Sequence, residues 1–203
     1  MLLDGAPVAV LPWKHVLVVT AHPDDECMFF GPTLQALLAH NVSLSALCLS
    51  QGNADGLGVR RQAELVASYG VLGVPRENVT CLDDALLQDG MTTVWDADYI
   101  LTFDAHGVSG HPNHMAVHFG ARRVQSVAKI PRLDVLSLDT RSVASKYTGI
   151  AAAMWDRLWP QRGLQTLAHP IEYGRSLAAM REHASQLVWF RYMHVNAVSI
   201  DHS

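Results

Sequence analysis

The chain has 203 residues, of which 49% are hydrophobic, and its formal net charge is −4 at pH 7. This length suits one domain with a core of its own, so we expect a single domain over residues 1–203. Lysine and arginine are not clustered, which argues against nucleic-acid binding, and no apolar run approaches the ~18 residues of a membrane-spanning helix.

The first predicted strand covers residues 16–20, an apolar, β-branched run typical of a strand that is buried on both faces. One imidazole and three carboxylates follow it directly, between residues 22 and 26. The elements predicted next are a helix at residues 29–39, a strand at 42–49, a glycine-rich loop at 50–58 and a helix at 60–72. Arg60 and Glu64 are spaced for an ion pair on that last helix.

The second part of the chain continues the alternation of strands and helices. Strands are predicted at residues 79–82, 99–103, 133–138 and 166–167, and helices at residues 113–127, 144–158 and 176–192. This order predicts an α/β fold with a mainly parallel sheet and helices on both faces. Ligands of such sheets gather at the C-terminal ends of the strands. Three polar loops begin at such ends, which predicts a functional site there.

The polar residues after two of these strands make a divalent metal site the leading hypothesis. His22, Asp25 and one further histidine give two imidazoles and a carboxylate, a common set for a catalytic zinc with an open position. Such a metal lowers the pKa of a bound water towards ~7. His111 and His114 are spaced i, i+3 at the start of a helix. We predict that His114 is the ligand and that His111 stabilises an oxyanion.

The remaining acidic residues after the first strand receive supporting roles. Asp24, which adjoins a ligand but lies across the turn, is the predicted general base, and Glu26 is predicted to bond a ligand or a backbone N–H. Two alternatives stay open. The acidic triplet can instead form the cap and first turn of a helix, and His118, four residues after His114, offers another metal pair.

Two motifs carry a resemblance to a known family. Ala-His-Pro-Asp-Asp-Glu at residues 21–26 resembles the signature of the LmbE/PIG-L zinc-dependent de-N-acetylases, and His-Pro-Asn-His at residues 111–114 resembles their second motif. The resemblance implies a Rossmann-like, three-layer fold. By position, it also assigns Zn²⁺ ligation to three residues and catalysis to two: His22, Asp25 and His114 as ligands, Asp24 as base and His111 at the oxyanion.

Within this family, the chain is similar to the eukaryotic N-acetylglucosaminyl-phosphatidylinositol de-N-acetylases. The similar stretches are residues 47–53, 60–65, 71–75, 101–114 and 185–191. Together with the residue-level reasoning, the resemblance gives four residues that support the ligands or contact substrate: Glu26, Asn53, Asp104 and Asn113. Asn113 stands where the family commonly has aspartate.

The resemblance implies hydrolysis of the acetamide of GlcNAc-phosphatidylinositol, the second step of GPI-anchor biosynthesis. The partner would then be a glycolipid at a membrane surface, and the location the cytoplasmic face of the endoplasmic reticulum. Two alternatives remain: a soluble deacetylase of another GlcNAc conjugate, and a non-catalytic relative that binds a glycolipid headgroup.

Overall fold

The computed structural model describes residues 13–82, 97–127, 133–140, 164–166, 170–187 and 198–202. This part of the chain forms one sheet of seven strands in the order β3-β2-β1-β4-β5-β7-β6. In chain order the strands are β1 His15–Thr20, β2 Ser43–Cys48, β3 Val79–Cys81, β4 Tyr99–Phe103, β5 Asp134–Leu138, β6 Leu164–Thr166 and β7 Val198–His202. Strands β1 to β5 pair in parallel, and β7 pairs antiparallel with β5 and β6. The predicted α/β fold with a mainly parallel sheet is confirmed.

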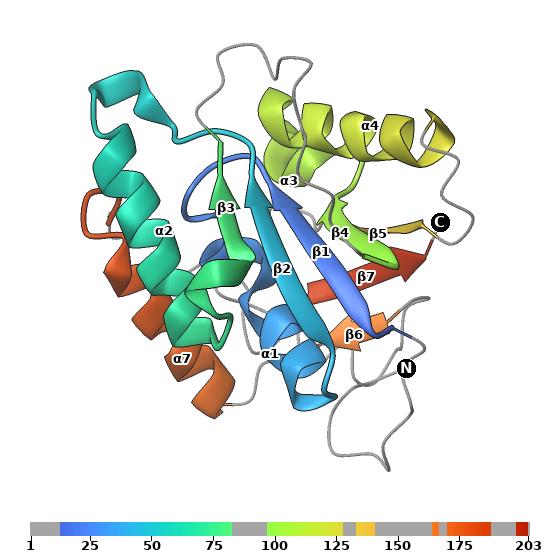
Figure 1. Cartoon of the computed structure of the whole chain (residues 1–203), viewed down its shortest axis with the longest axis horizontal. Coiled ribbons are helices and arrows are strands. Elements are labelled where there is room, and N and C mark those ends of the chain that lie inside the picture. The colour runs from blue at the N-terminus through green and yellow to red at the C-terminus, as the bar shows by residue number, and fades with distance from the viewer. Residues whose placement is uncertain are drawn as a thin grey trace.

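Helices cover both faces of the sheet, with α1, α2 and α7 on one side and α3 and α4 on the other (Figure 1). The α-helices among the described residues are α1 Gly31–Ala39, α2 Gly58–Leu72, α3 Gly107–Gly110, α4 Pro112–Val127 and α7 Pro170–Glu182. Three short helical segments accompany them: the π-helical η1 Glu26–Phe30 and the 3₁₀ segments η2 Asn53–Asp55 and η3 Arg76–Asn78. None of the helices in the described residues combines the length and apolar character needed to cross a bilayer.

Strand β1 lies between β2 and β4, where the order of the strands reverses. The chain leaves β1 towards β2 on one side and returns to add β4 on the other, which makes this edge a switch point where ligands bind in open α/β sheets. Residues 16–20 of β1 are all buried. Each buried aliphatic side chain of this kind contributes about 1.5–3 kcal/mol of hydrophobic stabilisation. The core therefore fixes the loops that follow β1 and β4.

Several boundaries differ from the predictions. The helix expected to start at residue 29 begins as η1 at Glu26, directly after the acidic residues. Strand β7 was not predicted, and it completes an antiparallel edge. Helix α7 runs from Pro170 to Glu182 instead of starting at residue 176. The helix predicted at residues 144–158 and residues 188–192 of the last predicted helix lie outside the described residues.

Candidate active site

The two polar loops that follow β1 and β4 meet at one edge of the sheet. The first contributes His22, Asp24 and Asp25. The second leads through α3 to His111, which lies just before α4, and to His114 in the first turn of α4. Because β1 and β4 are parallel neighbours, their C-terminal ends lie side by side. The sheet topology therefore brings together two segments that are far apart in the sequence.

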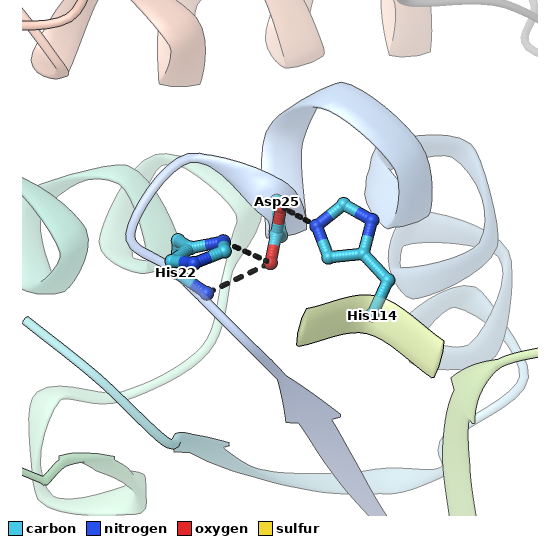
Figure 2. Close-up of side chains that lie close together, drawn as sticks. All are labelled: His22, Asp25 and His114. Carbon is cyan, nitrogen blue, oxygen red and sulfur yellow. Dashed lines mark hydrogen bonds and ion pairs between the residues drawn. The ribbon is translucent and has the colours of Figure 1, made fainter. Parts of the chain in front are cut away.

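His22, Asp25 and His114 form a compact cluster, in which their candidate ligand atoms all lie within 4.8 Å of one another. The Asp25 carboxylate lies between the two imidazoles (Figure 2), with Oδ1 at 3.2 Å from His114 Nε2 and Oδ2 at 3.9 Å from His22 Nδ1. Asp25 and His114 are only 2% and 5% exposed. These are the three residues predicted as metal ligands, and the structure places them together.

Asp25 does not act as a helix cap, although it precedes η1. It makes no side-chain capping bond. Its Oδ2 turns back and accepts the backbone N–H groups of Ala21 at 3.0 Å and His22 at 2.8 Å. The capping alternative is therefore wrong for Asp25. Burial alone would raise the pKa of this carboxyl, but the hydrogen bond and charge of His114 and the charge of His22 outweigh it, so the pKa lies below its ordinary value.

His114 is held so that one ring nitrogen faces Asp25. Its Nδ1 bonds the carbonyl oxygen of Gly107 at 3.0 Å, and its ring stacks flat on Phe103 with centroids 4.0 Å apart. A carbonyl at Nδ1 fixes the tautomer that leaves the Nε2 lone pair for a metal. Burial lowers the pKa of His114, but the bond to Asp25 more than offsets this effect, and the net shift is upward.

His22 completes the cluster from the turn after β1. Its Nε2 lies 2.9 Å from the side-chain nitrogen of Asn113. Burial, together with the nearby charges of His114 and His111, lowers the pKa of His22 despite the attraction of Asp25. The Asp25 carboxylate thus lies between two imidazoles. Two imidazoles and one carboxylate are a donor set that suits a divalent cation such as zinc, and a cation would offset the cost of burying the carboxylate, so the residues fit the predicted metal.

Asp24 lies beside the cluster on a strained turn. Its φ is +112°, in the region that L side chains rarely adopt, and its side chain is buried. Arg61 approaches it from α2, with Nη2 at 3.9 Å from Asp24 Oδ2, and the same guanidinium donates to the carbonyl oxygens of Pro23 and Gly52. Gly52 has a φ of +61° and a Cβ there would meet this guanidinium, so both the backbone conformation and the contact with Arg61 favour glycine.

Arg61 was not among the residues predicted from the sequence. Arg60, four positions before Glu64, was predicted to form an ion pair with it, and this ion pair is present at 3.0 Å. Arg61 points the other way, towards the loop after β1, and only the packing of α2 reveals this contact. In the sequence, both Arg60 and Arg61 lie at helical spacing from Glu64, so the spacing does not show which of them turns towards the loop after β1.

His111 lies at the exposed rim of the cluster. Its ring stacks against His114 with centroids 4.6 Å apart and meets His22 edge-on at 5.2 Å. Burial and the charge of His114 lower the pKa of His111. The backbone N–H of Asn113 donates to His111 Nδ1 at 3.3 Å, which leaves Nε2 as the nitrogen that carries the proton of the neutral ring.

The residues predicted to support the site occupy different places. Glu26 bonds a backbone N–H, that of Asp24, at 3.0 Å, as expected. Asp104 accepts four hydrogen bonds, from the backbone of His106, Gly107 and Thr140 and from the Thr140 hydroxyl. It therefore shapes the loop that leads to His114.

Asn53 and His118 lie away from the cluster. The Asn53 side chain accepts the N–H of Gly58 at 2.8 Å within the exposed loop before α2. His118 is buried, and its Nδ1 bonds the carbonyl oxygen of Phe103 at 2.8 Å. That nitrogen serves the packing of α4 on β4, which favours the His22, Asp25 and His114 set over the alternative pair.

Comparisons with known proteins identify the family to which the chain is related. The model of a family described as GlcNAc-PI de-N-acetylase (PIG-L) matches residues 17–125. The chain is 38% identical over 201 residues to the Schizosaccharomyces pombe protein named "Probable N-acetylglucosaminyl-phosphatidylinositol de-N-acetylase", covering 88% of this chain and 80% of that protein. It is 35% identical over 211 residues to the Bos taurus protein named N-acetylglucosaminyl-phosphatidylinositol de-N-acetylase, covering 92% and 83%.

A solved structure has the same fold. The N,N'-diacetylchitobiose deacetylase from Pyrococcus horikoshii matches with a TM-score of 0.63 at 17% identity, over 89% of this chain and 73% of that one. At this identity the match supports the fold, and the sequence relatives support the family.

Proposed function

This chain belongs to the GlcNAc-PI de-N-acetylase (PIG-L) family, and we propose that it hydrolyses the acetamide of N-acetylglucosaminyl-phosphatidylinositol. The products are acetate and glucosaminyl-phosphatidylinositol, in the second step of GPI-anchor biosynthesis. The observation that carries the proposal is the clustering of His22, Asp25 and His114 at the switch point of the sheet. Relatives at 35% and 38% identity bear names for this activity.

We assign the cation site to His22, Asp25 and His114, with zinc as the metal. A bound divalent cation supplies Lewis acidity, which acidifies water and polarises the acetyl carbonyl. Around it, the chain contributes fixed donors and acceptors. Asp25 is oriented by two backbone N–H groups, and the carbonyl of Gly107 orients His114, so little reorganisation accompanies binding.

Asp24 and His111 carry the proton transfers and charge stabilisation. The Asp24 carboxylate accepts the proton of the attacking water and later delivers it to the leaving nitrogen, so that the proton balance closes within the site. Arg61, at 3.9 Å, holds that carboxylate in place. The outward Nε2–H of His111 donates to the acetyl oxygen as negative charge develops there. His111 and Asn113 lie at the exposed rim, which is the side open to the sugar.

The substrate is a glycolipid, so the rim of the site has to approach a bilayer. We propose that the enzyme works at the cytoplasmic face of the endoplasmic reticulum membrane, as the family resemblance implies.

The experiment that tests this function measures acetate release by the full chain, loaded with zinc, from GlcNAc-phosphatidylinositol. A panel with a soluble GlcNAc-inositol conjugate and free GlcNAc separates glycolipid turnover from a broader deacetylase activity. We expect turnover of the glycolipid, loss of turnover after chelation and recovery on adding zinc. Binding of the glycolipid without acetate release by zinc-replete protein would instead identify a non-catalytic relative.

A further inference from the structure

A buried carboxylate, Glu26, lies behind the turn that carries Asp24 and Asp25. It is completely buried, and both of its oxygens accept hydrogen bonds. Oε2 accepts the backbone N–H of Asp24 at 3.0 Å. Oε1 accepts the Ser68 hydroxyl at 2.5 Å and His183 Nε2 at 2.6 Å. A residue of the acidic motif is thus bound from behind by α2 and by the segment after α7.

The bond to Asp24 occurs at the one point of the turn where the backbone is strained. The φ of Asp24 is +112°, although the residue is not glycine. A non-glycine residue keeps such a conformation only where the surrounding structure enforces it. Glu26 provides that enforcement, because its carboxylate receives the N–H of Asp24 and cannot move while Ser68 and His183 hold its other oxygen.

His183 is brought to Glu26 by contacts made around it. It follows the last turn of α7, and its N–H bonds Met180. Two residues on, the backbone N–H and hydroxyl of Ser185 bond the Glu64 carboxylate on α2. Glu64 is fixed in turn by Arg60. The segment from 183 to 185 is therefore clamped to α2, with its imidazole aimed inward.

The imidazole of His183 brings a polar nitrogen, Nδ1, into the core, which an apolar side chain would not do. Its Nδ1 is buried and has no hydrogen-bond partner among the described residues. Burying such an atom is unfavourable, so packing alone would be served better by leucine. The bond from Nε2 to Glu26 is the contact that explains a histidine here.

We propose that Glu26 and His183 are positioning residues for the deacetylase, which hold the strained backbone of Asp24 and so aim its carboxylate at the substrate. The inference rests on the proposed function. It gives the segment after α7 a role in catalysis without contact to the substrate. His183 lies 157 positions from Glu26 in the sequence, so no local pattern connects the two residues.

The test compares His183→Leu with His183→Gln in the full, zinc-loaded chain. Gln places its side-chain N–H near the position of His Nε2, whereas Leu removes the donor and keeps the bulk. For His183→Leu we expect kcat to fall by about 10- to 100-fold with KM nearly unchanged. His183→Gln should recover most of that loss. Protein loaded with Co²⁺ gives a readout besides activity, the visible absorption bands of the bound ion. These bands should broaden in the His183→Leu variant and regain their shape in the His183→Gln variant.

Two further variants complete the design. Ser176→Ala is the matched control, because Ser176 is a buried residue of α7 whose hydroxyl accepts from Gln35, whereas the Glu26 carboxylate is bonded by Ser68, His183 and the Asp24 N–H. It should retain the wild-type kcat. If His183→Leu does not fold, Ser68→Ala replaces it, since it removes the other donor to the same Glu26 oxygen, and kcat should fall by about 10-fold with KM unchanged.

The possible outcomes separate the two proposals. Wild-type protein without acetate release refutes the proposed function, and the cobalt spectra then decide on positioning alone. Active wild-type protein together with an unaffected kcat and spectrum in His183→Leu, or in Ser68→Ala in its place, overturns the positioning role. An equal loss in Ser176→Ala, or no recovery in His183→Gln, also overturns it, because the loss then reflects packing.

Discussion

At the scale of single residues, neighbouring carboxylates in one turn serve different purposes because their surroundings differ. Asp25 accepts two backbone N–H groups and faces two imidazoles. Asp24, one position earlier, has a positive φ that turns its side chain to Arg61. Glu26 points to the opposite side, into the contact with His183. One reversal of the backbone thus separates the proposed ligand, the proposed base and the proposed support.

The first prediction concerns Asp24. Replacing it with Asn keeps the shape of the side chain but removes the proton acceptor. We expect kcat for acetate release to fall by about 10²- to 10⁴-fold, the usual contribution of a general base, while zinc content stays at the wild-type level. Asp55→Asn, in the exposed segment η2, is the control and should retain full activity. Acetate release at the wild-type rate by zinc-loaded Asp24→Asn protein would remove Asp24 from the mechanism.

At the scale of elements, the loop between β4 and α4 determines where His114 lies. Asp104 accepts the backbone N–H groups of His106 and Gly107 in this loop and that of Thr140 after β5. Gly107 adopts a φ of +61°, and a Cβ there would meet Met115 Cγ at 2.7 Å. The carbonyl of that same glycine orients His114. The loop therefore supports His114, a proposed metal ligand in the first turn of α4.

The second prediction tests that support. Asp104→Asn retains one acceptor oxygen but loses the second, so the Thr140 N–H at 2.6 Å loses its acceptor. Displacement of the loop moves the Gly107 carbonyl away from His114. Zinc affinity, measured by competition with a chelator, should fall by about 10- to 100-fold. Unchanged affinity would show that the loop positions His114 without the Asp104 carboxylate.

The third prediction concerns the contact between α2 and the segment after α7. Burial would raise the pKa of Glu64, but hydrogen bonds from Ser185 and Arg60 outweigh it, so the pKa lies below 4.5. A depressed carboxyl pKa stabilises the fold above pH 4.5, and this stabilisation is lost as the pH falls through the folded-state pKa. Ser185→Ala should cost about 1 kcal/mol of unfolding free energy at pH 7.

The pH dependence of that cost distinguishes the charged contact from packing. Denaturant unfolding of wild type and Ser185→Ala at a series of pH values should show the two curves converging as the pH drops below 4.5. A difference that stays constant over this range would mean that the hydroxyl stabilises through packing, not through the ionised carboxylate.

At the scale of the whole molecule, the sequence predicts those strands and loops whose residues form a clear local pattern. The strand at residues 16–20, the polar loop after it and the loop that ends in His114 each have a clear signal, and the parallel sheet brings them together. The contacts of Arg61 with Pro23 and of His183 with Glu26 have no local signal, because the partners lie 38 and 157 positions away in the sequence. Strand β7 is a short edge strand whose formation depends on pairing with β5 and β6.

The same chain offers a second group that could bind a metal. Glu26, Cys27 and His183 lie close together on the far side of the acidic turn, and all three are buried. Their existing bonds argue for a supporting role, because Glu26 already accepts from His183 and Ser68, and Cys27 contacts Met180. Burial raises the pKa of the Cys27 thiol well above its ordinary value, which disfavours the thiolate that a metal needs.

The most direct test of the central claim is X-ray absorption at the zinc edge of the zinc-loaded full chain. If His22, Asp25 and His114 hold the metal, the spectrum will show only nitrogen and oxygen neighbours, at about 2.0–2.2 Å, with imidazole scattering that weakens in His114→Ala. A sulfur neighbour at about 2.3 Å, or a spectrum that His114→Ala leaves unchanged, would contradict the account and locate the metal elsewhere.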